Sequence, residues 1–204
     1  MLRYICALFL FFLTSINVSA CSMLDFWLHM PDTITPYLDL KLRSELVDYS
    51  RMGVQAVVKN KYGELTLIDT FINDFMQLKL SSSSTLQIKR LPSNLGDSLF
   101  CVIKTFGDDV KESDVALFNE KWEKVCDVDL YALITIPNDS LLPRHVNNSL
   151  KDYHIVPLAS ATLSPRNDDL SIKMLYAFSF CEDKDKKNNC LVQKVVKWNG
   201  ENFK

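Results

Sequence analysis

The first part of the chain has the spacing of amphipathic helices. Between positions 24 and 51, apolar residues recur every three or four positions among mostly charged neighbours, the period of a helix with one buried face. Pro31 and Pro36 interrupt this stretch, and proline inside a helix removes a backbone hydrogen bond. The pattern therefore predicts a short helix followed by a longer one. The longer helix carries its apolar face on Leu38, Leu42, Leu46 and Tyr49.

From position 54 to 122 the apolar period becomes that of strands. Short apolar runs are separated by turn-forming segments such as residues 61–63 and 81–84, which predicts antiparallel pairing. Apolar side chains alternate with polar ones around residues 78–88, and this favours a sheet with one buried and one solvated face. We therefore interpret residues 81–84 as a plain hairpin loop. The predicted strands are residues 54–59, 65–69, 75–80, 85–91, 99–106 and 112–122.

The last third of the chain repeats the order of helix followed by strands. Residues 140–152 form a helix candidate that Asp139 or Ser140 can cap. Residues 158–163, 170–180 and 191–198 are further strand candidates. Together these patterns predict an α+β protein in which helices pack on an antiparallel sheet, with residues 21–204 as a single domain.

The two halves are weakly similar to each other. Leu80-Ser81 precedes the run 86–89 of sequence Leu-Gln-Ile-Lys, and Leu163-Ser164 precedes the run 170–173 of sequence Leu-Ser-Ile-Lys. Each half also ends in a return strand with a Lys-Trp pair, at Trp122 and at Trp198. A duplicated helix-plus-meander unit, covering about residues 24–126 and 139–204, fits this similarity. Two unrelated hairpins in a sheet protein fit it equally well.

Residues 1–20 have the composition of a signal peptide. Arg3 is followed by an uncharged apolar run from Tyr4 to Leu13 and then by small and polar residues up to Ala20. The apolar run is about ten residues, whereas a spanning helix needs roughly 20. Removal of residues 1–20 takes away one basic group and leaves 184 residues with 22 basic and 25 acidic groups. The sequence therefore predicts an exported protein.

Cys21 is a candidate for lipid attachment. Val18-Ser19-Ala20-Cys21 resembles a bacterial lipobox, in which the cysteine thiol is acylated and becomes the new N-terminus. Val18 and Ala20 also suit ordinary signal peptidase, so cleavage without lipid is the alternative. Without Cys6 of the signal peptide five cysteines remain, and lipid on Cys21 leaves an even four for disulfides. With the lipid, we expect the protein in the periplasm or at the outer membrane; without it, we expect a secreted protein.

The other four cysteines are expected to form disulfides because the protein is predicted to be exported. Cys181 and Cys190 would bridge the arms of the last hairpin, and Cys101 with Cys126 would form a second pair. Four cysteines allow three pairings, so the spacing favours this choice without excluding the others.

Charge and composition exclude several partner classes. The net charge is -2, and no segment concentrates basic residues as nucleic-acid binding requires. With five scattered glycines, the chain also lacks a phosphate-binding loop. His29, His145 and His154 lack the spacing of a zinc site. We therefore expect no metal and no other cofactor.

No catalytic constellation is recognisable. Asp108-Asp109 follows a glycine in a turn, where aspartate bonds nearby backbone amides. The mixed charges of residues 182–187 suit a solvated hairpin tip that hinders edge pairing. The chain contains no nucleophile elbow of the Gly-x-Ser-x-Gly type. Acid and base groups can nevertheless converge from distant positions, so an extracytoplasmic hydrolase remains the alternative to a binding protein.

An ordered series of short segments resembles a family of secreted Bacteroidales proteins of unknown function. The series begins at Met30-Pro31-Asp32 and Pro36-Tyr37-Leu38, continues through residues 78–86 and 102–107, and adds Glu112-Ser113 and Trp122. The likeness runs from Phe26 to Trp198. The resemblance implies an exported protein of the Bacteroidales lineage, and it implies no particular activity. That lineage would make Thr33, Ser98 and Ser140 candidates for O-glycosylation, because each follows an aspartate and precedes an apolar residue.

These observations together predict a non-catalytic binding or structural component of the cell envelope. Its partner would be a protein or another envelope component, contacted through a sheet face or hairpin edges. A lipid on Cys21 would add a membrane anchor.

Overall fold

The computed structural model describes residues 21–134, 157–177 and 189–204. The predicted signal peptide, the predicted helix at 140–152, Ser140 and Cys181 lie outside these residues. Among the described residues, no helix has the length and apolar character needed to cross a membrane.

Two helices precede the sheets, as the proline positions predicted. Helix α2 (Met23–Leu28) is capped by the Ser22 hydroxyl, which accepts the Asp25 N–H. Helix α3 (Leu40–Arg51) is capped by Asp39, whose carboxylate accepts the Leu42 N–H. Such caps satisfy backbone donors that have no partner inside the helix.

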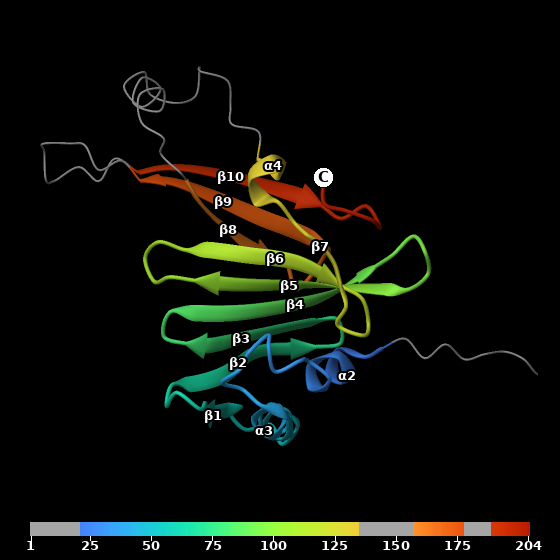
Figure 1. The fold of residues 1–204 in the computed structure, drawn as a ribbon, viewed down its shortest axis with the longest axis vertical. Coiled ribbons are helices and arrows are strands. Elements are labelled where there is room, and N and C mark those ends of the chain that lie inside the picture. Colours follow the sequence, from blue (N-terminus) through green and yellow to red (C-terminus); the bar gives the residue numbers. More distant parts are fainter. Residues whose placement is uncertain (1–20, 135–156, 178–188) are drawn as a thin grey trace, which may run out of the picture.

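Seven antiparallel strands form the larger sheet, and their order in the sheet follows their order in the chain (Figure 1). This meander confirms the predicted antiparallel pairing. The β3–β4 hairpin turns within residues 81–84, as predicted, with Ser81 paired to Ser84 and residues 82–83 at the tip. The strands are β1 (Val57–Lys59), β2 (Leu65–Ile72), β3 (Phe75–Ser81), β4 (Ser84–Pro92), β5 (Ser98–Phe106), β6 (Glu112–Phe118) and β7 (Lys124–Asp127).

The predicted strand at 112–122 was too long. Strand β6 ends at Phe118, because the Asn119 side-chain oxygen accepts the N–H groups of Lys121 and Glu123 and holds a turn. Trp122 lies in the left-handed region of the backbone, with φ 63°. The chain then returns as β7, which pairs with β6.

The second sheet has three antiparallel strands in the order β10-β9-β8. They are β8 (Leu158–Leu163), β9 (Asp169–Ala177) and β10 (Asn189–Lys197). The two similar sequence stretches fall on the β3–β4 hairpin and the β8–β9 hairpin. The duplication stays a prediction, because most of the segment that would hold the second helix lies outside the described residues.

The larger sheet is covered by the helices on one face and, over β4 to β6, by the smaller sheet on the other. On one face, α2 and α3 share a core with side chains of β1 to β6, including Leu78, Ile88 and Phe100, and α3 contacts β1 and β2. On the other face, Cys101, Ile103 and other residues of β5 and β6 pack against the smaller sheet. The fold is thus α+β in the broad sense and mostly β, with three layers. The expectation of one solvated face holds for β3, where Lys79 is exposed, and is wrong for β4, because the smaller sheet covers Gln87 and Lys89.

Buried polar side chains link the two sheets. The N–H groups of Leu163 and Ala161 on β8 donate to Gln87 Oε1 and to Ser113 Oγ, both at 3.0 Å. Strand β8 is an edge strand, so these amides have no strand partner on that side. Gln87 and Ser113 supply the acceptors that a buried amide needs.

The predicted pairing of Cys101 with Cys126 was wrong. Both are free thiols, Cys101 buried and Cys126 exposed. Each lies directly opposite Leu117, on β5 and on β7, so strand β6 separates them. Two strand spacings put their Cα atoms about 10 Å apart, beyond the roughly 7 Å that a disulfide allows. The proposed Cys181–Cys190 bridge involves a residue outside the described part and stays a prediction.

Thiol labelling should separate these two cysteines. Burial raises the pKa of the Cys101 thiol and removes it from solvent. We expect iodoacetamide to modify Cys126 in the folded protein and Cys101 only in denaturant, since the exposed thiolate is the reactive form. Peptide mass spectrometry after each treatment measures this. Equal modification of both under native conditions, or a peptide joining them, would contradict the structure.

Candidate functional site

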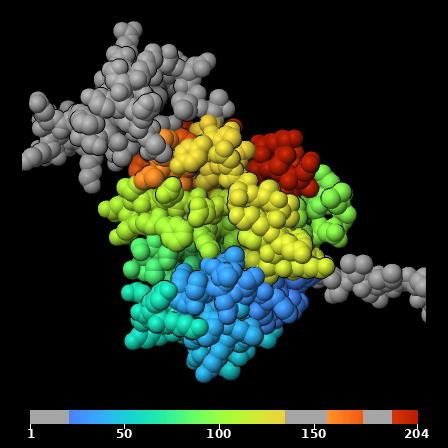
Figure 2. Space-filling model, in the orientation of Figure 1, coloured from blue at the N-terminus to red at the C-terminus, as the bar shows by residue number. Residues whose placement is uncertain are grey.

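A groove of about 570 Å³ opens on the helix-side face of β5 to β7, beyond the area that α2 and α3 cover. Its floor is apolar and contains Val102, Ala116 and Phe118, with Ile34 from the loop between the helices at one side. Figure 2 shows the yellow-green surface of β5 and β6 between the blue N-terminal segment and the yellow segment that ends in α4. A concave apolar floor of this kind suits a bound ligand or segment.

Lys104 and Asp114 lie side by side on the helix-side face of the sheet, at one side of the groove floor. They are directly paired in the β5–β6 register. The Lys104 ammonium donates to the Ile34 carbonyl, so it ties the loop between the helices to the sheet. Burial lowers the pKa of Lys104, and the nearby Asp114 carboxylate acts in the opposite direction. Lys104 therefore holds the shape of the groove.

Helix α4 (Leu130–Leu133) closes the other side. Asp129 caps it by accepting the N–H groups of Tyr131 and Ala132. The Tyr131 hydroxyl donates to the Pro157 carbonyl at 2.9 Å. Burial is the main cause that raises the pKa of Tyr131, and the nearby Glu112 carboxylate raises it further. The phenol thus stays protonated and joins this rim to the start of β8.

The groove carries an excess of negative charge. Four carboxylates and two ammonium groups line it, a net of -2. The Asp127 carboxylate accepts from Lys124 at 2.7 Å, and Lys104 is engaged by Ile34. Glu112 and Asp114 are both exposed at the groove. The arrangement favours a positively charged ligand, because unbalanced carboxylates attract cations.

A second cavity of about 740 Å³ lies at one end of the strands. The β4–β5 loop, the β6–β7 turn and the C-terminal turn enclose it, and its apolar side chains are Leu95, Leu99 and Val125. The Asn94 N–H donates to the Gly200 carbonyl and connects two of these segments. Leu95 is 91% exposed.

The predicted modification sites do not come together. Thr33 is exposed in the turn between α2 and α3, whereas Ser98 is half-buried at the start of β5 and lines the second cavity. Cys21 is half-buried just before α2. Glycosylation of Thr33 and Ser98 and lipidation of Cys21 stay predictions.

The described residues offer little for catalysis or metal binding. No group of three or more His, Cys, Asp or Glu residues among them is arranged to hold a metal ion. Ser113 faces the smaller sheet, where its hydroxyl is bonded to Thr105 and to the Ala161 N–H. A hydroxyl held this way is not placed to attack a ligand in the groove.

Sequence reasoning missed the groove. Its signal was a charged residue within each of two apolar strands, Lys104 and Asp114, at similar distances from the turn that joins them. The short run Asp127-Val128-Asp129 on the rim was a second signal. Neither signal matches a known sequence motif for binding or catalysis. The groove itself exists only because the helices cover part of the sheet and leave the rest open.

The chain is therefore an antiparallel two-sheet protein with N-terminal helices. Its groove has an apolar floor and a net negative charge. The chain belongs to the family described as "Protein of unknown function (DUF3256)", whose model matches residues 15–203. The predicted resemblance to a family of unknown function is confirmed.

A solved structure shares the fold. It is described as a domain of an uncharacterized protein from Porphyromonas gingivalis W83, and the TM-score is 0.65 at 17% sequence identity. The likeness covers 89% of this chain and 96% of that chain. The organism of this neighbour is consistent with the predicted Bacteroidales lineage. No curated protein matches the chain.

Proposed function

We propose that the protein is an exported, non-catalytic binding component of the cell envelope, anchored by lipid on Cys21, and that the groove on β5 to β7 is its contact site. Export and anchoring are supported by the signal-peptide composition of residues 1–20 and by the lipobox-like run that ends at Cys21. Binding is supported chiefly by one observation, the apolar groove with a net charge of -2.

The groove chemistry suits an extended segment of a partner protein that carries lysine or arginine between apolar residues. Apolar side chains of such a segment would pack on Val102, Ala116 and Phe118. Its cationic side chains would reach Glu112 and Asp114, which point into solvent at one side of the floor. Charge pairs of this type direct a partner to one site more than they add affinity.

Calorimetric titration with a capped hexapeptide that alternates lysine and leucine tests this proposal. We expect saturable binding to residues 21–204. Replacing both Glu112→Gln and Asp114→Asn should weaken it about fivefold to tenfold, since each exposed charge pair contributes up to about 1 kcal/mol. The double variant Glu64→Gln and Asp109→Asn makes the same charge change on exposed residues outside the groove lining.

That control variant should bind like the original protein. Equal affinity for a peptide with glutamate in place of lysine, or equal weakening by the control variant, would overturn the proposed contact site.

A further inference from the structure

We propose that the end of the molecule that holds Cys21 lies directly against a lipid bilayer, with Leu95 inserted into its surface. This inference rests on the proposed lipidation of Cys21 and goes beyond it, because it sets which surface of the protein the membrane covers.

The backbone of Cys21 is fixed to the folded body. Its N–H donates to Glu120 Oε1 at 3.3 Å, and its carbonyl accepts from Arg90 Nη1 at 3.5 Å. Its side chain packs on the core beneath the helices, and the Ser22 cap of α2 follows at once. A lipid on the Cys21 sulfur would therefore begin at the body of the protein without a flexible tether. The surface around Cys21 has to approach the bilayer to let the acyl chains enter it.

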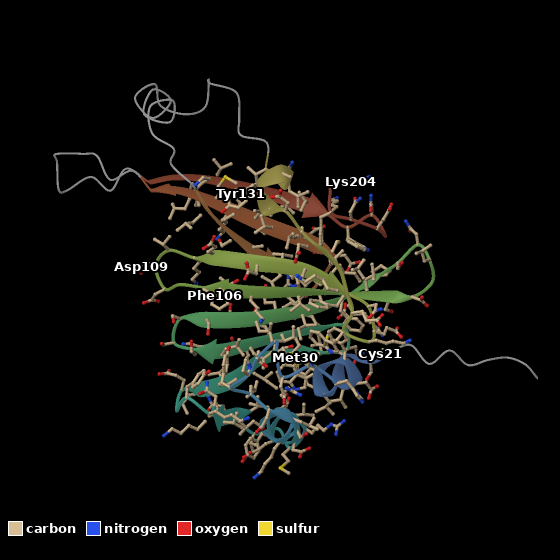
Figure 3. All side chains as sticks on the ribbon, viewed as in Figure 1. Cys21, Met30, Phe106, Asp109, Tyr131 and Lys204 are labelled. Carbon is tan, nitrogen blue, oxygen red and sulfur yellow. The ribbon has the colours of Figure 1, made fainter. Side chains whose placement is uncertain are left out.

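Several turns gather at this same end. Arg90, which contacts Cys21, is bonded through its N–H to Asp74 in the β2–β3 turn. Glu120, the other contact of Cys21, lines the second cavity together with Leu95 of the β4–β5 loop. The β5–β6 turn with Asp109 lies at the opposite end (Figure 3). The membrane-facing surface is thus the Cys21 end, formed by the β2–β3 turn, the β4–β5 loop and the β6–β7 turn.

Apolar side chains are exposed on the Cys21 end. Leu95 is 91% exposed in the β4–β5 loop, and Ile72 is 44% exposed at the end of β2, next to the β2–β3 turn. Ile72 and Phe71 line a small pocket of about 190 Å³ with Met23 and Leu24, beside the lipid attachment point. An exposed leucine in a loop loses contact with water when it enters a membrane, which favours that orientation.

A vesicle-binding measurement with one acyl chain tests the orientation. A protein of residues 21–204 contains every helix and strand that the structure describes. With Cys126, Cys181 and Cys190 replaced by serine, a myristoyl maleimide would attach a single chain to Cys21, because Cys101 is buried. One myristoyl chain gives only marginal, reversible binding, so a further contact is measurable. The probes are vesicles of phosphatidylcholine and phosphatidylethanolamine, and circular dichroism checks the fold of each variant.

Replacing Leu95→Asp should lower the vesicle partition coefficient roughly tenfold. Val110→Asp is the matched control, because Val110 is 40% exposed in the β5–β6 turn at the other end, and it should bind as the unsubstituted protein does. Equal binding of all three proteins, or equal loss in both variants, would overturn the orientation.

The lipidation is tested separately in cells that make the full chain. Incorporation of a clickable fatty acid by the original protein and not by Cys21→Ala supports the anchor. Equal incorporation by both overturns the anchor, whereas the vesicle measurement judges the orientation by itself.

Discussion

Replacing Phe26 by alanine is expected to lower the free energy of unfolding by about 3–5 kcal/mol. The Phe26 ring is fully buried between two other rings. It stacks on Phe100 with centroids 3.7 Å apart and on Trp122 with centroids 3.9 Å apart. The Trp122 indole N–H also donates to the Phe26 carbonyl at 2.7 Å. Loss of the ring removes apolar burial and both stacking contacts, and leaves a cavity between α2 and the sheet.

Urea unfolding followed by circular dichroism measures this loss. Phe106→Ala is the matched control, because Phe106 is 47% exposed at the end of β5, and it should cost about 1 kcal/mol. Similar losses in the two variants would show that the stack of three rings does not hold α2 on the sheet.

The second large effect is expected at Lys89, a buried cation between the sheets. Its ammonium donates to Asp74 at 2.7 Å and lies 3.8 Å from Asp168 in the β8–β9 turn. The Lys89 side chain is 1% exposed, whereas that of Asp74 is 40% exposed. Asp74→Ala should lower the free energy of unfolding by about 2–3 kcal/mol, because it leaves a buried cation without its nearest carboxylate.

Lys89→Met should cost less than Asp74→Ala, although it removes the more buried residue. Methionine fills a similar volume without a charge, and an apolar residue in place of a buried ion is often tolerated. Parallel urea unfolding of the two variants gives the order. A larger loss in Lys89→Met would mean that the ion pairs stabilise the fold more than the desolvation of Lys89 costs.

Most strands could be predicted from the sequence because their apolar runs are short and separated by strong turn signals. The layers could not be predicted. Gln87 and Lys89 look like solvent-facing positions of β4, yet both are buried under the smaller sheet. There Gln87 accepts the N–H of Leu163 on β8, and the Lys89 ammonium lies near the carboxylates of Asp74 and Asp168. Period-2 alternation cannot distinguish a solvated polar side chain from one bonded to another sheet. Strand β7 was missed for a related reason, because its residues are all exposed and carry no apolar pattern.

The candidate site was less predictable than the fold. The groove depends on Lys104 reaching the Ile34 carbonyl and on Tyr131 reaching Pro157, contacts between residues separated by 70 and 26 positions. No local pattern encodes such distances. The sequence pointed to contact through a sheet face and did not indicate which face or which charges.

The most direct test of the central claim, that the groove on β5 to β7 is a binding site, is to map the contact residue by residue. Amide nitrogen–proton correlation spectra of residues 21–204 would be recorded while the lysine–leucine hexapeptide is added. We predict saturable shifts confined to residues that line the groove, with Lys104, Asp114, Phe118 and Tyr131 among them. Shifts spread evenly over the surface, or grouped on the smaller sheet while the groove residues stay unchanged, would contradict the claim.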